Sequence, residues 1–124
     1  MDMKFYYCKK CGKMLAAAND VDTDTVCCGE VMDVILPGTT DAAQEKHVPE
    51  YTVTDGKVDV VVGAVEHPML DAHYIEWVIV QTNCGNQRKF LKPGQAPKVS
   101  FLIGPDEEVE AVYAYCNLHG LWKK

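Results

Sequence analysis

Short runs of apolar and β-branched residues dominate the chain from about residue 50 onward, and they predict antiparallel strands. Tyr51–Thr54 and Lys57–Val62 flank Asp55-Gly56, a dipeptide that supplies the positive φ angles of a tight hairpin turn. The segment 74–82 is rich in β-branched and aromatic residues, which predicts a central strand. Further strands are predicted at 88–91, 98–103 and 108–115, with turns at 83–86, 93–94 and 104–105. This spacing of strands and turns is typical of an antiparallel sandwich, and no long stretch has helical periodicity.

Residues 1–36 have a different pattern, with four of the six cysteines and few apolar positions. A segment shorter than about 40 residues seldom folds on its own core without a metal ion or disulfides. The turn-rich sequence Pro37-Gly38-Thr39-Thr40 follows it. We therefore predict two domains, a metal module at 1–36 and a sandwich at 37–124.

Composition and charge exclude several classes of function. The 124 residues carry a formal net charge of −6, and Lys and Arg form no basic stripe, which disfavours nucleic-acid binding. No apolar run reaches the roughly 20 residues that a membrane-spanning helix needs, and the N-terminus lacks the apolar core of a signal peptide. We expect a soluble, cytoplasmic protein.

The cysteines of the first domain are spaced for metal binding. Without an export signal, thiolate ligands are a better explanation than disulfides for Cys8-x-x-Cys11 and the adjacent pair Cys27-Cys28. Four thiolates suit tetrahedral iron or zinc, and structural zinc remains an alternative. Because neighbouring side chains of an extended chain face opposite ways, the backbone must bend at Cys27-Cys28 and the tetrahedron should be distorted.

All four histidines and another cysteine lie in the second domain: His47, His67, His73, Cys116 and His119. If they converge, four neutral imidazoles and one thiolate exceed what tetrahedral zinc requires. A first-row redox metal with one open position fits better. In ligand type the set resembles a haem with an axial cysteine, whose thiolate donates electron density to the iron.

Six short motifs in this order make the chain similar to the desulfoferrodoxin family of two-iron superoxide reductases over essentially its full length. The first part resembles desulforedoxin, and the remainder resembles the superoxide reductase domain. The motifs are Cys8-x-x-Cys11-Gly12, Cys27-Cys28-Gly29, Glu45-Lys46-His47-x-Pro49, Glu66-His67-Pro68-Met69, His73-Tyr74-Ile75-Glu76-Trp77 and Cys116-Asn117-Leu118-His119-Gly120-Leu121-Trp122.

The resemblance implies a mainly β fold, with a small rubredoxin- or desulforedoxin-like metal module followed by an immunoglobulin-like antiparallel β-sandwich, paired as a homodimer. It implies two irons and neither haem nor flavin. Cys8, Cys11, Cys27 and Cys28 would bind the first iron. The second would have a square-pyramidal site, with His47, His67, His73 and His119 equatorial and Cys116 axial. Glu45 would be a sixth ligand in the oxidised state, and Lys46 would attract superoxide and assist protonation of peroxide.

The implied activity is the one-electron reduction of superoxide to hydrogen peroxide, with electrons from an external donor such as rubredoxin. Lys46 has a physical role in it, because an acidic chain repels an anion unless local positive charge attracts it. Two alternatives remain: a non-enzymatic electron carrier of rubredoxin type, and a zinc-stabilised sandwich that binds a protein partner.

The remaining cysteine and the aromatic residues are expected to have packing roles. Cys84 has no assigned partner and is expected to be a small, partly buried side chain. The aromatic residues are expected in the core or in the wall of the metal site: Tyr74, Trp77, Tyr113, Tyr115 and Trp122.

Overall fold

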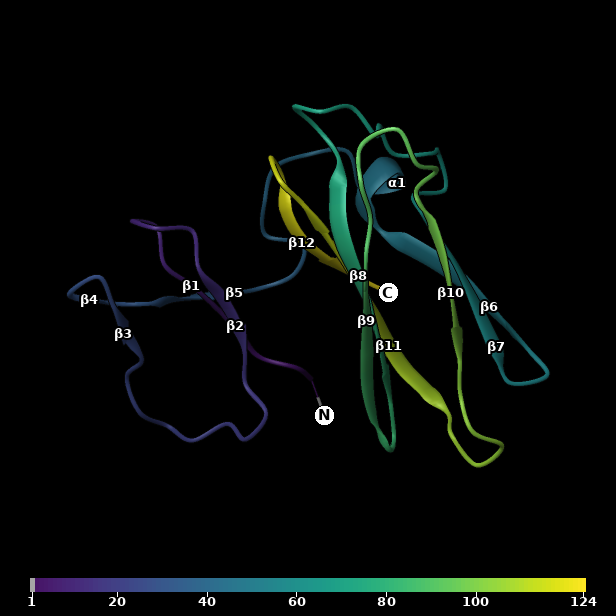
Figure 1. Ribbon diagram of the computed structural model, residues 1–124, viewed down its shortest axis with the longest axis horizontal. Helices are drawn as coiled ribbons and strands as arrows, with labels where there is room; N and C mark the ends of the chain where they lie inside the picture. The colour runs from purple at the N-terminus through teal and green to yellow at the C-terminus, as the bar shows by residue number, and fades with distance from the viewer. Residues whose placement is uncertain (1) are drawn as a thin grey trace. The chain divides into compact units, whose positions relative to one another are not determined.

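The computed structural model describes residues 2–124, which form two compact units, one ending at Leu36 and the other spanning Pro37–Lys124 (Figure 1). The first unit has a three-stranded antiparallel sheet in the order β2-β1-β5 and a two-stranded hairpin, β3-β4. The bounds are β1 (Phe5–Tyr7), β2 (Met14–Ala16), β3 (Val26–Cys27), β4 (Glu30–Val31) and β5 (Asp33–Ile35). Among its described residues only Phe5, Cys8 and Met32 are buried, as expected of a segment too short for a large core.

The second unit contains two antiparallel sheets, in the orders β10-β7-β6 and β12-β11-β8-β9, and one short helix. Its elements are α1 (Gln44–His47), β6 (Pro49–Thr54), β7 (Lys57–Val62), β8 (Ile75–Thr82), β9 (Gly85–Phe90), β10 (Lys98–Leu102), β11 (Val109–Cys116) and β12 (Gly120–Lys123). The mainly β fold and the antiparallel sandwich predicted from the sequence are confirmed. Among the described residues no helix is long and apolar enough to cross a membrane.

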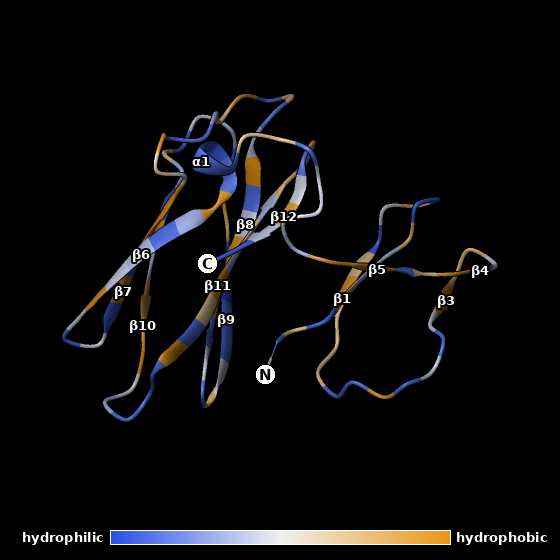
Figure 2. Ribbon diagram, turned by 180° about the vertical axis from the view of Figure 1, so that it is seen from behind, coloured by the Kyte–Doolittle hydropathy of each residue, from blue (hydrophilic) through white to orange (hydrophobic). Residues whose placement is uncertain are grey.

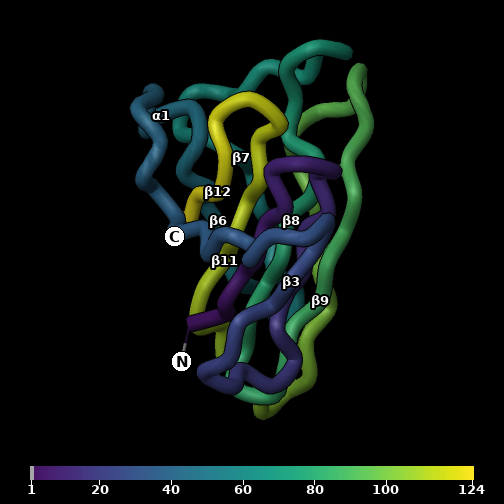
Figure 3. Tube along the Cα trace, turned by 90° about the vertical axis from the view of Figure 1, so that its left-hand side faces the viewer, coloured from purple at the N-terminus to yellow at the C-terminus, as the bar shows by residue number. Residues whose placement is uncertain are grey.

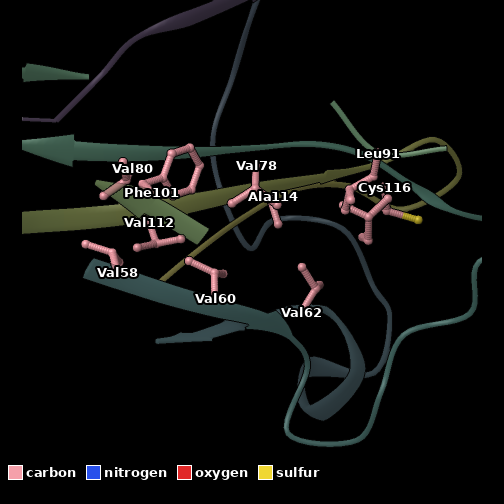
Figure 4. Close-up of a cluster of buried hydrophobic side chains, with 11 residues drawn as sticks. Val58, Val60, Val62, Val78, Val80, Leu91, Phe101, Val112, Ala114 and Cys116 are labelled. Atoms are coloured by element: carbon pink, nitrogen blue, oxygen red, sulfur yellow. The ribbon is translucent and has the colours of Figure 1, made fainter. Parts of the chain in front are cut away.

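Valine side chains from both sheets form the core of the sandwich. Val58, Val60 and Val62 alternate along β7 and are at most 1 % exposed. They pack in one cluster with valines and alanine of β8 and β11 (Figure 4). Each such buried valine stabilises the fold by roughly 1.5–3 kcal/mol. Cys116 ends this cluster, and its sulfur points away from the valines (Figure 4).

The edge strands β9 and β10 are joined by side chains. Along its length β9 is exposed and mostly hydrophilic (Figure 2). The Gln87 side chain donates to the Leu102 carbonyl at 2.7 Å, and the Lys89 ammonium donates to the Ser100 carbonyl. These bonds occupy carbonyl groups that an edge strand would otherwise present to another chain.

The hairpin prediction is confirmed. β6 pairs with β7 through Thr54 and Lys57, and Asp55 and Gly56 have φ angles of 49° and 77°. The predicted turn at 83–86 is shorter, because β9 already begins at Gly85. The sequence did not predict α1, β12 or the short strands of the first unit.

Three connections meet at one end of the sandwich. α1, the β7–β8 connection and the β11–β12 turn lie together at this end in both views (Figures 1 and 3). Each of them carries histidines, so the topology gathers residues that are far apart in the sequence.

Candidate metal centres

The four cysteines of the first unit form one cluster. Cys8 and Cys11 come from the β1–β2 connection, and Cys27 and Cys28 from the β3–β4 hairpin. Their sulfur atoms all lie within 4.8 Å of one another, with Cys11 and Cys27 3.6 Å apart. These separations are far longer than the roughly 2.05 Å of a disulfide and suit four ligands around one ion.

The adjacent cysteines converge because the backbone turns sharply at the second of them. Cys28 has a φ of 53°, which is uncommon for a residue other than glycine, and Gly29 follows at 76°. The two left-handed residues bring the Cys27 and Cys28 sulfurs 3.9 Å apart. The bend predicted from the sequence is confirmed.

Electrostatics in this cluster favour a bound cation. The backbone N–H of Cys11 lowers the pKa of Cys8 to about 7, whereas the neighbouring Cys8 sulfur raises the pKa of Cys27 to about 12. Thiolate ligands repel one another at this distance. All four sulfurs therefore ionise together only around a positive charge.

The four imidazole rings of the second unit form a closed square. Successive ring centroids are 4.6 Å (His47–His67), 4.8 Å (His67–His73), 5.0 Å (His73–His119) and 4.9 Å (His119–His47) apart. Neighbouring rings are inclined by 77–89°, and His47 and His73 face each other across the square at 6.2 Å. Neighbouring rings therefore meet edge to face around a common centre.

Hydrogen bonds select the nitrogen that each ring presents. The Nδ1–H of His47 donates to the Ala43 carbonyl at 2.7 Å, and that of His67 donates to the Pro68 carbonyl at 2.6 Å. Their Nε2 atoms keep a free lone pair, as carbonyl-anchored metal ligands do. For His119 the inward atom is Nδ1, 3.1 Å from the His47 Nε2.

Two of the inward nitrogens are buried without a partner. The Nε2 atoms of His67 and His73 have no hydrogen-bond partner within the described part of the chain. Buried polar atoms are nearly always satisfied, so a pair of unpartnered acceptors in one square indicates a cation-binding site. The donor set therefore fits a metal ion.

Cys116 contributes a fifth donor to the set. The donor atoms of Cys116, His47, His67 and His73 lie within 4.8 Å of one another, and the Cys116 sulfur is 3.9 Å from the His119 Nδ1. Burial raises the pKa of the Cys116 thiol, while the backbone N–H groups of Leu118 and His119 lower it. A bound cation would ionise this sulfur, and the two N–H groups would then support the thiolate.

Three of the imidazoles are held neutral. Burial lowers the pKa of His67 to about 4, and it also lowers the pKa values of His47 and His73. Neutral rings at physiological pH are the form that binds metal.

The arrangement agrees with known proteins. The model of the desulfoferrodoxin family matches residues 39–124, more than half of the chain. The chain belongs to the desulfoferrodoxin family. The desulfoferrodoxin of Nitratidesulfovibrio vulgaris is 43% identical over 120 residues, which cover 97% of this chain and 94% of that protein.

Solved structures agree with this assignment to the desulfoferrodoxin family. The crystal structure of the superoxide reductase from Treponema pallidum superposes with a TM-score of 0.84 at 36% identity, covering 100% of this chain and 99% of that one. The one-iron superoxide reductase from Giardia intestinalis, 35% identical, covers 64% of this chain and 95% of its own, with a TM-score of 0.55. The four-cysteine and histidine–cysteine sets match the two-iron arrangement of a desulfoferrodoxin.

Glu45 and Lys46 lie at the rim of the histidine square in this desulfoferrodoxin-family chain. Both are exposed on α1, immediately before the buried His47. The charge of Lys46 contributes to lowering the pKa of His47 and of His73, so it acts on two sides of the square. Ligation by the Glu45 carboxylate stays a prediction.

The aromatic predictions hold for the most buried members. Trp77, Tyr113 and Trp122 are buried. The Trp122 ring stacks on His47 at 4.9 Å, and its Nε1–H donates to the His119 carbonyl at 3.1 Å. Trp122 therefore holds two of the square's histidines, a role that its place in the sequence did not reveal.

Cys84 differs from its prediction. It is exposed rather than partly buried, because Asn83 and Cys84 form the tip of the β8–β9 hairpin. It belongs to neither donor set.

Proposed function

We propose that this chain is a superoxide reductase, which reduces superoxide by one electron to hydrogen peroxide at an iron held by the histidine square. The observation that carries the proposal is the square itself, with two unpartnered Nε2 atoms within 4.8 Å of one buried thiol. The similarity of the whole chain to the superoxide reductase from Treponema pallidum also supports the proposal.

The ligands are assigned by the donor atoms. His47, His67 and His73 would bind iron through Nε2, His119 through Nδ1, and Cys116 through its sulfur. When bound, ferrous iron would supply the electron and a coordination position for the anion. The first iron is held by Cys8, Cys11, Cys27 and Cys28.

The chain's own groups prepare that position for an anion. Because imidazole ligands are neutral and only the Cys116 thiolate would be anionic, bound ferrous iron would keep a net positive charge in a chain whose net charge is −6. Lys46 adds a second local charge at the rim, where it attracts superoxide and assists protonation of the product. Glu45 would supply a further ligand to the oxidised iron. We place the reaction in the cytoplasm.

The second iron needs an electron after each turnover, and we propose an external donor such as a rubredoxin. In the four-cysteine set, Cys11 and Cys28 are exposed, which suits electron exchange at the first iron. A homodimer is also proposed, since the resemblance to the family implies one. The same exposed sulfurs favour the second candidate function, a rubredoxin-type electron carrier.

Metal analysis and a superoxide pulse test the proposal. The purified protein should contain two irons with two iron–thiolate absorption bands, and Cys116→Ala should remove only the second band. The reduced protein should consume superoxide and release one hydrogen peroxide for each, without oxygen. Zinc in place of iron would contradict the proposal. Two irons with no reaction would leave the carrier function instead.

A further inference from the structure

We propose that Asn117 is a positioning residue that holds His73 in the metal square by clamping the backbone on both sides of it. The inference rests on the proposed iron site. Asn117 directly follows β11, and His73 lies in the connection that leads into β8.

The clamp consists of three hydrogen bonds. The Asn117 Oδ1 accepts from the Tyr74 N–H at 2.9 Å, and its Nδ2–H donates to the Ala72 carbonyl at 3.0 Å. Its own backbone N–H donates to the Tyr74 carbonyl at 3.2 Å. One side chain thus binds the residue before His73 and the residue after it.

Among the described residues, the backbone hydrogen bonds of His73 itself are both made with Leu70. The His73 N–H donates to the Leu70 carbonyl at 3.0 Å, and the Leu70 N–H donates to the His73 carbonyl at 2.9 Å. These two bonds restrain His73 itself, and Asn117 restrains its neighbours Ala72 and Tyr74. No hydrogen bond of the His73 Nδ1 is found among the described residues, whereas the Nδ1–H of His47 is anchored on the Ala43 carbonyl. Backbone restraint by Asn117 takes the place of that anchor.

The opposite end of the same strand pair contains a matching clamp with no metal ligand in it. Asn83 directly follows β8, and its Oδ1 accepts from the Glu108 N–H at 2.9 Å. Its Nδ2–H donates to the Asp106 carbonyl at 3.4 Å, and its N–H donates to the Glu108 carbonyl at 3.1 Å. The bracketed residue there is Glu107, whose carboxylate accepts from the Thr82 hydroxyl at 2.8 Å.

Both asparagines therefore make the same three kinds of hydrogen bond at an end of the β8–β11 pair. They differ in the residue that lies between the two bonded neighbours, which is His73 at one end and Glu107 at the other. The Glu107 side chain is already hydrogen-bonded to the Thr82 hydroxyl. The His73 side chain instead presents a buried, unpartnered Nε2 to the square. Because hydrogen bonds that orient metal ligands typically affect metal affinity by about 10–100-fold, loss of the Asn117 clamp should weaken iron binding.

The test compares Asn117→Ala with Asn83→Ala in the full chain. Ferrous iron affinity of the histidine site is measured by competition with a chelator. The ferric iron–thiolate band of each variant is then recorded. Both variants should lose a similar amount of thermal stability. Only Asn117→Ala should lower iron affinity, by about 10–100-fold, and shift the band.

A conservative variant and an iron-free measurement keep the test decisive. Asn117→Asp retains an acceptor for the Tyr74 N–H and loses the donor to Ala72, so its iron affinity should fall between those of wild type and Asn117→Ala. In iron-free protein, amide hydrogen exchange at Tyr74 should quicken in Asn117→Ala but not in Asn83→Ala. Equal iron affinity and equal spectra in Asn117→Ala and Asn83→Ala would overturn the inference. Absence of iron from the histidine site of the wild type would instead overturn the proposed function.

Discussion

Gly63 and Lys46 are in backbone contact, and this contact fixes the helix that carries the rim of the metal site. A Cβ on Gly63 would lie 2.6 Å from the Lys46 carbonyl oxygen, and the Val65 carbonyl is nearer still. Two hydrogen bonds join the same segments: Gly63 N–H to the Val48 carbonyl at 3.1 Å and Val65 N–H to the Glu45 carbonyl at 2.8 Å.

Gly63→Ala should therefore displace α1 and slow superoxide reduction. Gly94→Ala is the matched control, because Gly94 has a φ of 88° against 89° at Gly63 and a Cβ added there would meet no atom within 4 Å. Both variants acquire the left-handed strain of about 1–2 kcal/mol, but only Gly63→Ala adds the clash. Rates of superoxide decay and the ferric absorption band should change in Gly63→Ala alone. Equal effects of the two substitutions would contradict this role of the contact.

The local features of the fold were predictable, whereas those set by distant pairing were not. The hairpin at Asp55-Gly56 depends on two adjacent residues that tolerate positive φ, so the sequence suffices. Strand β12 has four residues and forms by pairing with Tyr113–Cys116, so no pattern of its own predicts it. Cys84 was misplaced because its exposure depends on how far the hairpin tip extends.

The chemistry of the site followed from residue types, and its geometry did not. Four histidines and a cysteine indicate a redox metal by ligand preference. The order of the rings around the square depends on three separate connections meeting in space, and so does the use of Nδ1 by His119. The role of Asn117 depends on Ala72 and Tyr74, more than 40 positions away, and is invisible in the sequence.

Lys46→Ala should slow the reaction of the reduced protein with superoxide, most strongly at low ionic strength. A positioned charge raises the encounter rate by about tenfold or more, and salt near 1 M shortens the screening length to about 3 Å. Rates measured over a range of salt concentrations should converge with wild type as salt rises. Lys57→Ala is the control, because Lys57 adjoins the hairpin turn and pairs with Asp59 at 3.6 Å. A Lys46→Ala rate equal to wild type at every salt concentration would refute electrostatic steering.

Glu45→Gln should alter the ferric spectrum of the second iron more than it alters the reaction of the reduced protein with superoxide. If the carboxylate is the sixth ligand, its loss shifts the ferric absorption band and leaves superoxide consumption by the reduced protein near the wild-type rate. Glu50→Gln, which removes an exposed pairing with Lys124, should leave the band unchanged. An unaltered ferric spectrum in Glu45→Gln would rule out ligation.

Iron-free protein should lose stability as the pH falls from about 6.5 to 4. The pKa of His67 is about 4 in the folded chain, against 6.5 when unfolded, so the unfolded state binds more protons between these values. By linkage, the free energy of unfolding is highest above pH 6.5 and falls by up to about 1.4 kcal/mol per pH unit for each such histidine.

Fluorescence-monitored denaturation measures this loss, since both tryptophans lie in the second unit. His67→Gln, which does not titrate in this range, should flatten the slope. The carboxyl group of Glu107 has a lowered pKa, so its stabilising effect is lost only at lower pH, below its usual value of about 4.5. A stability independent of pH between 6.5 and 4 in the wild type would show that His67 is not desolvated.

Cys28→Ser should remove the first iron and leave the reaction at the second intact. Serine lacks the thiolate, so the cluster drops to three sulfurs and the corresponding absorption band should disappear. Every residue proposed to bind the second iron belongs to the unit that begins at Pro37, so the pre-reduced protein should still consume superoxide at about the wild-type rate. Cys84→Ser, at the exposed cysteine outside both donor sets, should keep both bands. A Cys28→Ser protein that retains the first band would show that Cys28 is not a ligand. A slower single turnover would show that the first iron takes part in the chemistry itself.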